Sequence, residues 1–168
     1  MKKPVLLTIV VSVVVASLWG WGWHHTAAPA DGGNRLLADR IWIDHVPRNE
    51  RDTINAFVMI SEHAIGAFQA TSQWRGAFEA FRYEASGADL RVVYPQTGDR
   101  EQPRAKAKRC AEGGMDFCLE IEGASRGVKK YYSRQGWEIK QAGDLDAVAH
   151  RIEALRTQLA GNAPGVGN

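Results

Sequence analysis

The two cysteines are the residues whose type and spacing point most directly to chemistry. Cys110 and Cys118 lie on either side of a short segment that contains Gly113 and Gly114. A glycine pair between two extended segments is typical of a β-hairpin, and in an oxidising compartment the two thiols can join across it as a disulfide. Redox C-x-x-C motifs and cysteine-based zinc sites need other spacings or more ligands. We therefore expect a structural disulfide, with two buried free thiols as the alternative.

The other side chains able to act as ligands, nucleophiles or acids are scattered along the chain. After residue 30 the histidines are His45, His63 and His150, and none has neighbours at the spacing of a zinc site. The glycine-rich phosphate loops G-x-x-x-x-G-K-[ST] and G-x-G-x-x-G do not occur. Ser72, Ser125 and Ser133 are not expected to lie in the context of a nucleophile elbow. Carboxylates such as Glu79 and Glu120 are more often cross-strand ion-pair partners than acid–base pairs. We expect no enzyme, no metal site and no cofactor.

The elements that position these residues are mainly β-strands. Apolar and polar side chains alternate in a series of short segments, which glycine and proline turns separate. Many short antiparallel strands joined by short turns are typical of a meander that closes on itself. We therefore expect one up-and-down antiparallel β-barrel of about eight strands. The expected strands cover residues 40–43, 53–61, 64–71, 74–85, 88–94, 103–109, 117–122, 128–134 and 137–139.

The last element changes its hydrophobic period. Its apolar residues recur at helical spacing, which predicts a C-terminal amphipathic α-helix with one apolar stripe. A helix with a single stripe must dock on another surface, and we expect that surface to be the outside of the barrel. The stripe consists of Leu145, Val148, Ile152, Leu155 and Leu159.

The N-terminus has the layout of an export signal. Lys2 and Lys3 precede an almost wholly apolar run over residues 4–23, and small residues follow at 28–30. We expect residues 1–30 to be a signal peptide, with an uncleaved inner-membrane anchor through residues 4–23 as the alternative. Both interpretations place the rest of the protein outside the cytoplasm, in the periplasm or the extracellular space. The domain organisation then follows as a linker at 31–39, the barrel with its helix at 40–160 and a tail at 161–168.

The charge of the chain argues against a nucleic-acid partner. The formal net charge is +2, and Lys2 and Lys3 account for it, so the part after the export segment is balanced. A nucleic-acid-binding domain normally carries a basic excess of its own.

A closed meander with one C-terminal helix resembles the lipocalin-like group of small barrels. Arg40, Ile41 and Trp42 lie where lipocalins have a Gly-x-Trp triplet, with Arg40 in place of the glycine. Arg134, on a late strand, corresponds to the arginine that packs over that tryptophan in lipocalins. The resemblance implies a cup that carries a small apolar ligand without covalent chemistry.

Small residues on strands expected to face inward would leave room for such a ligand, and eight strands are just enough to hold one. The alternative is that these small residues let aromatic rings fill the core. The first function hypothesis is therefore a carrier of a small apolar or amphipathic molecule or lipid. The second is a structural or protein-interaction module with a packed barrel, and a hydrolase or isomerase on the same scaffold is a distant third. For the carrier, the expected ligand-binding residues are Phe68, Trp74, Phe78, Arg82, Val92, Leu119 and Tyr132.

Overall fold

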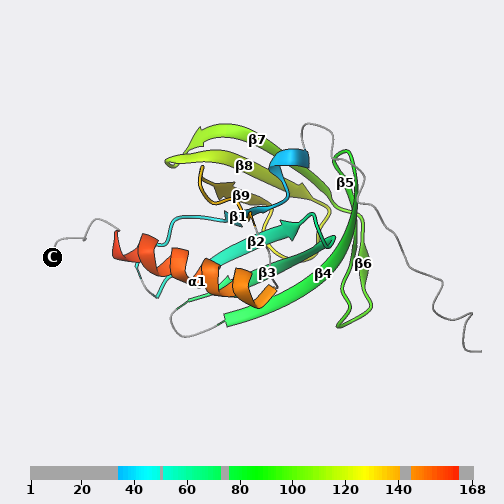
Figure 1. Cartoon of the computed structure of the whole chain (residues 1–168), viewed down its shortest axis with the longest axis horizontal. Helices are drawn as coiled ribbons and strands as arrows, with labels where there is room; N and C mark the ends of the chain where they lie inside the picture. Colours follow the sequence, from blue (N-terminus) through cyan, green and yellow to red (C-terminus); the bar gives the residue numbers. More distant parts are fainter. Residues whose placement is uncertain (1–33, 50, 73–75, 141–144, 163–168) are drawn as a thin grey trace, which may run out of the picture.

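The computed structural model describes residues 34–49, 51–72, 76–140 and 145–162. These residues form a closed antiparallel β-barrel of eight strands with one C-terminal helix, which confirms the expected fold class (Figure 1). The export segment expected at residues 1–30 lies outside the described residues. The elements are η1 (Asn34–Leu36), β1 (Arg40–Ile43), β2 (Ile54–Ile60), β3 (Ile65–Thr71), β4 (Gly76–Ser86), β5 (Asp89–Val93), β6 (Arg100–Glu101), β7 (Arg104–Glu112), β8 (Met115–Glu122), β9 (Lys130–Ser133) and α1 (Leu145–Gly161).

The strands follow the order β4-β3-β2-β1-β9-β8-β7-β5-β6, and an additional pairing of β4 with β5 closes the ring. The short strand β6 and the strand β7 follow one another and both pair with β5, so together they occupy one position in the barrel. Because neighbouring strands run in opposite directions, the connections at 44–53, 94–99 and 123–129 all reach the same end of the barrel. We call this end the loop end; η1 precedes β1 at the opposite end.

The barrel domain begins earlier than the sequence suggested. Residues 34–39 were expected to belong to a linker, but η1 packs on β7 and Leu37 is fully buried in the interior. The indole Nε1 of Trp42 donates a hydrogen bond of 3.0 Å to the carbonyl oxygen of Leu37. The segment 34–39, expected to belong to a linker, therefore packs against the barrel at the end opposite the loops.

Aromatic rings fill the interior of the barrel. The ring of Phe57 lies 5.0 Å from that of Phe68, 5.9 Å from that of Phe81 and 5.5 Å from that of Tyr131, measured between centroids. Gly66 makes this packing possible: a methyl group in its place would lie 2.6 Å from the carbonyl oxygen of Val58 and closer still to the ring of Phe81. A strand glycine here marks a close approach of a large side chain to the backbone.

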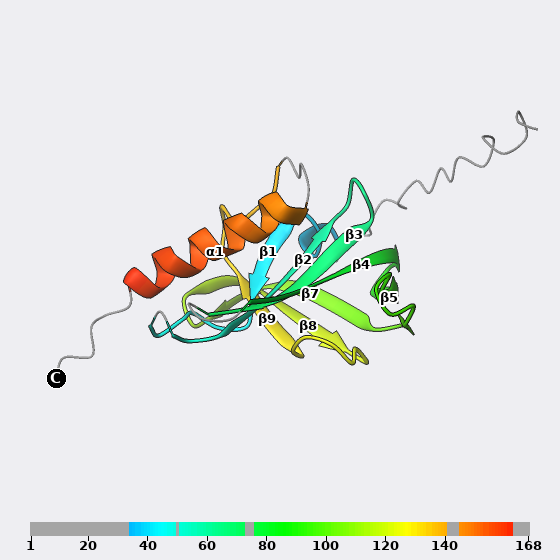
Figure 2. The ribbon, with the colours of Figure 1, turned by 90° about the horizontal axis from the view of Figure 1, so that it is seen from below.

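The outer face of β1, β2 and β3 carries a second apolar cluster, and α1 covers it (Figures 1 and 2). Val148 and Ile152 of the helix are buried in this cluster, as the apolar stripe predicted. The hydroxyl of Thr71 on β3 donates a hydrogen bond of 2.9 Å to the carboxylate of Glu153. The expected docking of the helix on the outside of the barrel is confirmed.

Within the described part of the chain, no helix has both the length and the hydropathy required to cross a bilayer.

The expected disulfide is present. Cys110 and Cys118 are bonded, with their Cα atoms 5.7 Å apart, and they join β7 to β8. The pairing of these two strands shifts register between Arg109 and Glu112, so the disulfide lies beside this irregularity. The hairpin is therefore cross-linked where its ladder of hydrogen bonds is interrupted.

Candidate functional site

The structure separates the residues that were expected to line one ligand site. Phe68, Val92 and Leu119 belong to the interior cluster. Phe78 instead points outward and is 43% exposed, and Tyr132 packs against the outer cluster. Arg82 is exposed and Trp74 lies outside the described residues. The structure therefore places Phe78, Tyr132 and Arg82 outside the interior that contains Phe68, Val92 and Leu119.

The register of β3 and β4 explains this correction. Phe68 of β3 lies opposite Glu79 of β4, while Phe78 lies opposite Gln69. Residues directly opposite each other share a face of the sheet, so the side that faces inward on β4 contains Glu79 and Phe81 and excludes Phe78.

The arginine expected to pack over Trp42 has another partner. The Nε of Arg134 donates a hydrogen bond of 3.1 Å to the carbonyl oxygen of Gly114. Arg40, which replaces the glycine of the lipocalin triplet, lies over the ring of Phe117, at 3.9 Å from the guanidinium carbon to the ring centroid. Its guanidinium also forms an ion pair of 2.6 Å with Glu138. Arg40 therefore ties β1 to the segment after β9.

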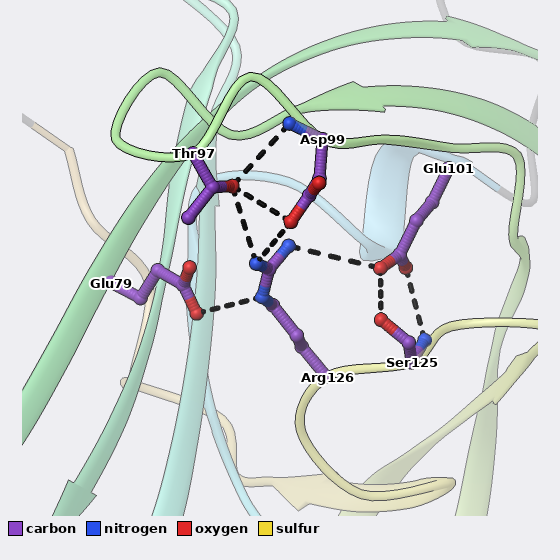
Figure 3. Close-up of polar contacts among 6 residues, drawn as sticks. All are labelled: Glu79, Thr97, Asp99, Glu101, Ser125 and Arg126. Atoms are coloured by element: carbon purple, nitrogen blue, oxygen red, sulfur yellow. Dashed lines mark hydrogen bonds and ion pairs between the residues drawn. The ribbon is translucent and has the colours of Figure 1, made fainter.

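The most elaborate polar site lies at the loop end and centres on Arg126, in the connection between β8 and β9 (Figure 3). Its Nε lies 3.1 Å from a carboxylate oxygen of Glu79 on β4, and its Nη2 lies 2.8 Å from one of Asp99. Its Nη1 lies 3.8 Å from a carboxylate oxygen of Glu101 on β6. Arg126 is 21% exposed, so these contacts are partly shielded from water. One side chain thus connects the loop between β8 and β9 to β4 and to the adjoining 94–99 connection and β6.

The backbone around Arg126 is attached to the same partners. The Ser125 amide and hydroxyl both donate hydrogen bonds to the carboxylate of Glu101. Thr97 donates a hydrogen bond of 2.8 Å from its hydroxyl to the carboxylate of Asp99. This hydrogen bond, followed by the neighbouring Arg126, holds the pKa of Asp99 below its ordinary value. The carboxylate of Asp99 therefore stays charged at neutral pH.

The guanidinium of Arg126 also covers an aromatic ring. Its central carbon lies 3.7 Å from the centroid of Tyr94, within the range of a cation–π contact. Burial, and then the negative charge of Glu101, raises the pKa of Tyr94 to about 12, although Arg126 acts in the opposite direction. Tyr94 is therefore a neutral phenol that forms the boundary between the apolar interior and the charged cluster.

The next residue brings the backbone onto the aromatic interior. Gly127 has a φ of 75°, and a methyl group in its place would lie 2.6 Å from the ring of Phe68 and nearer still to the hydroxyl of Tyr131. The amide of Val128 donates a hydrogen bond of 2.9 Å to that hydroxyl. The connection between β8 and β9 therefore lies directly over the interior rings.

A motif overlooked in the sequence occurs in this connection. Residues 123–127 have the letters G-x-S-x-G, with Ser125 at the centre. A nucleophile elbow places that serine between a strand and a helix, whereas this segment joins two strands. The described contacts of Ser125 are with Glu101, not with an imidazole. Among the residues that the structure describes, no imidazole is placed to activate Ser125 as a nucleophile.

A histidine at the same end contacts two carboxylates, that of the preceding residue and one from farther along the same connection. The Nδ1 of His45 lies 2.9 Å from Asp44, and its Nε2 lies 3.2 Å from Asp52. These contacts hold the connection between β1 and β2 together. Among the described residues, no group of three or more histidine, cysteine or acidic side chains is arranged to hold a metal ion.

Comparison with known proteins adds no relative. No protein-family model, no curated protein sequence and no solved structure matches this chain. The fold and the site therefore define a class only: a closed antiparallel β-barrel with a helix on its outer face and an arginine-centred cluster at its loop end.

Proposed function

We propose that this protein is an exported, non-enzymatic interaction module whose barrel is a packed scaffold. The observation that carries the proposal is the filled interior. Trp42, Phe57, Phe81, Leu119 and Tyr131 each have 2% or less of their surface exposed. A hollow large enough for water would expose the rings beside it, so there is no such hollow against these side chains.

The small residues of the inner face support the same proposal. Ala105 and Ala107 of β7 are buried in the interior cluster, together with the large rings of Trp42 and Phe117. Gly66 lies against the ring of Phe81. Small residues that lie beside large ones complete a close-packed core. The sequence allowed either a packed core or a ligand space, and this packing favours the packed core.

Export is supported by the disulfide and by the N-terminal sequence. Disulfides persist in oxidising compartments and are rare in the cytosol, and Cys110 and Cys118 are bonded. Residues 1–30 have the composition of a signal peptide or a membrane anchor. We therefore propose a location in the periplasm or outside the cell, with membrane attachment through residues 4–23 if that segment is retained. The balanced charge of the remaining chain gives no reason to propose a nucleic-acid partner.

Ligand uptake by the full-length protein tests this proposal. Native mass spectrometry of protein purified from the cells that produce it, and titration with the neutral dye N-phenyl-1-naphthylamine, should show no lipid-sized mass increment and no dye binding. The variant Phe81→Ala is the matched control, because deletion of a buried ring leaves an apolar cavity that can take up an aromatic molecule. A lipid-sized increment, or dye binding by the wild type as strong as that of the control, would overturn the packed-scaffold proposal in favour of the carrier.

A further inference from the structure

We infer that residues 123–128 are a lid over the aromatic interior, that Arg126 is its latch, and that release of the latch admits a flat apolar molecule to the rings beneath. This inference goes beyond the proposed function, because it concerns a second, open state of the barrel. It rests on the hinges of the segment, the surface beneath it and the nature of its attachments.

The lid has a glycine on each side of the three residues that could move with it. Gly123 and Gly127 both have positive φ, 78° and 75°, a backbone conformation that glycine adopts at little cost. Between them lie Ala124, Ser125 and Arg126. Glycines at the ends of a short connection let it rotate with small changes in the strands that it joins, as hinge positions do in other lids.

The surface beneath the lid is aromatic. The backbone of Gly127 contacts the ring of Phe68 and the hydroxyl of Tyr131, while Arg126 covers the ring of Tyr94. The rings of Phe68 and Tyr131 are both neighbours of Phe57 in the interior cluster. Displacement of the lid would therefore expose ring faces and one phenolic hydroxyl, a surface that suits a flat apolar molecule.

Charged contacts supply most of the attachment of the lid. Arg126 and Ser125 bind Glu79, Asp99 and Glu101, which lie on β4, on the 94–99 connection and on β6. The apolar side chains of the lid are Ala124 and Val128, which are partly buried against the interior cluster. Ion pairs in partial contact with water are weak individually and are screened by salt. The lid is therefore the part of the loop end that salt can loosen without disturbing the core.

The balance of charge makes Arg126 the decisive residue. It is the common partner of three carboxylates, and without its positive charge Glu79, Asp99 and Glu101 would repel one another. A network that depends on one central cation loses all its pairs at once when that cation is removed, so the effect exceeds the loss of a single exposed pair.

The test compares Arg126→Gln with Lys129→Gln in the full-length protein. Both variants lose one positive charge in the same connection, but Lys129 is exposed and, among the described residues, its side chain makes no hydrogen bond or ion pair. Hydrogen exchange of the Val128 amide reports opening of the lid, since that amide is bonded to Tyr131. Binding of N-phenyl-1-naphthylamine reports access to the rings.

Arg126→Gln should speed exchange at Val128 by about tenfold or more and should gain dye binding, while Lys129→Gln behaves as the wild type. Wild-type protein moved from about 0.05 M to about 1 M salt should show the same direction of change, because the screening length falls to about 3 Å. This second arm needs no variant and decides the matter if Arg126→Gln does not fold. Unchanged exchange at Val128 in both arms would overturn the lid. Dye binding by the wild type at low salt would instead overturn the packed scaffold.

Discussion

The guanidinium carbon of Arg126 lies 3.7 Å from the ring centroid of Tyr94, so a charged side chain of one loop rests on a ring of the barrel interior. Tyr94 is almost fully buried, while the carboxylate of Asp99, another partner of Arg126, is 59% exposed. The loop end is therefore closed by a layer with an aromatic inner side and an ionic outer side. A substitution that alters either the charge or the packing at the loop end therefore affects both Arg126 and Tyr94.

Tyr94→Phe should reduce the loss of stability at alkaline pH. Burial raises the pKa of Tyr94 to about 12, whereas an unfolded tyrosine has a pKa of about 10. The neutral phenol therefore contributes stability in full below pH about 10, and this contribution is lost as the pH rises towards about 12. Urea unfolding between these pH values should show a shallower decline of the free energy of unfolding for Tyr94→Phe. Burial also raises the pKa of Tyr83 and of Tyr131, so the decline should not vanish. Parallel curves for the variant and the wild type would contradict the prediction.

Gly66→Ala should destabilise the barrel by about 1–3 kcal/mol, because the added methyl group has no space. It would lie 2.6 Å from the carbonyl oxygen of Val58 and even nearer to the ring of Phe81, so the ring must leave its position. Gly161→Ala is the control, since nothing lies within 4 Å of a methyl group at that residue. Thermal and urea unfolding of the two variants measure the difference. Equal stabilities would mean that the interior around Phe81 is loosely packed.

Removal of the disulfide should lower the free energy of unfolding by about 2–3 kcal/mol while leaving the fold intact. Cys110 and Cys118 are eight residues apart in sequence, so the loop that the bond closes is short and the gain is at the lower end of the usual range. The double variant Cys110→Ala with Cys118→Ala should match wild-type protein treated with a reductant. Urea unfolding under oxidising and reducing conditions provides the measurement. An unchanged urea midpoint after reduction would show that the disulfide does not reduce the conformational entropy of the unfolded chain enough to affect stability.

Ile152→Ala should destabilise the protein by about 2–5 kcal/mol and weaken the docking of α1. Ile152 is buried in the cluster that the helix covers, whereas Arg151, its neighbour, is exposed. Arg151→Ala is therefore the control, and it should change stability by no more than about 0.5 kcal/mol. Hydrogen exchange of the helix amides, measured beside urea unfolding, distinguishes local undocking from global loss of stability. Equal exchange in both variants would indicate that the helix is held by contacts other than its apolar stripe.

Patterns that repeat within a few residues were enough to predict the main strands and the helix, but not η1 or β6, and the strand expected at 137–139 forms only an isolated bridge at Glu138. The strand at Arg40–Ile43, the apolar stripe of α1 and the pairing of the two cysteines all agree with the structure. These features depend on alternation along a strand, on helical spacing and on a turn between two nearby residues, and each can be recognised without knowledge of distant contacts.

The sequence by itself determined that side chains along each strand point alternately to the two faces of the sheet. Only the tertiary structure decided which face of β4 points inward. Phe78 and Phe81 are three residues apart and so lie on opposite faces of one strand, and alternation alone favours neither. The register of β4 with β3 made the choice, and it placed Phe81 inside. The partners of Arg126 were decided in the same way, because Glu79, Asp99 and Glu101 reach it from strands and turns that meet only when the barrel closes. A linear pattern carries no record of such contacts, since they depend on the pairing of segments that lie far apart in the chain.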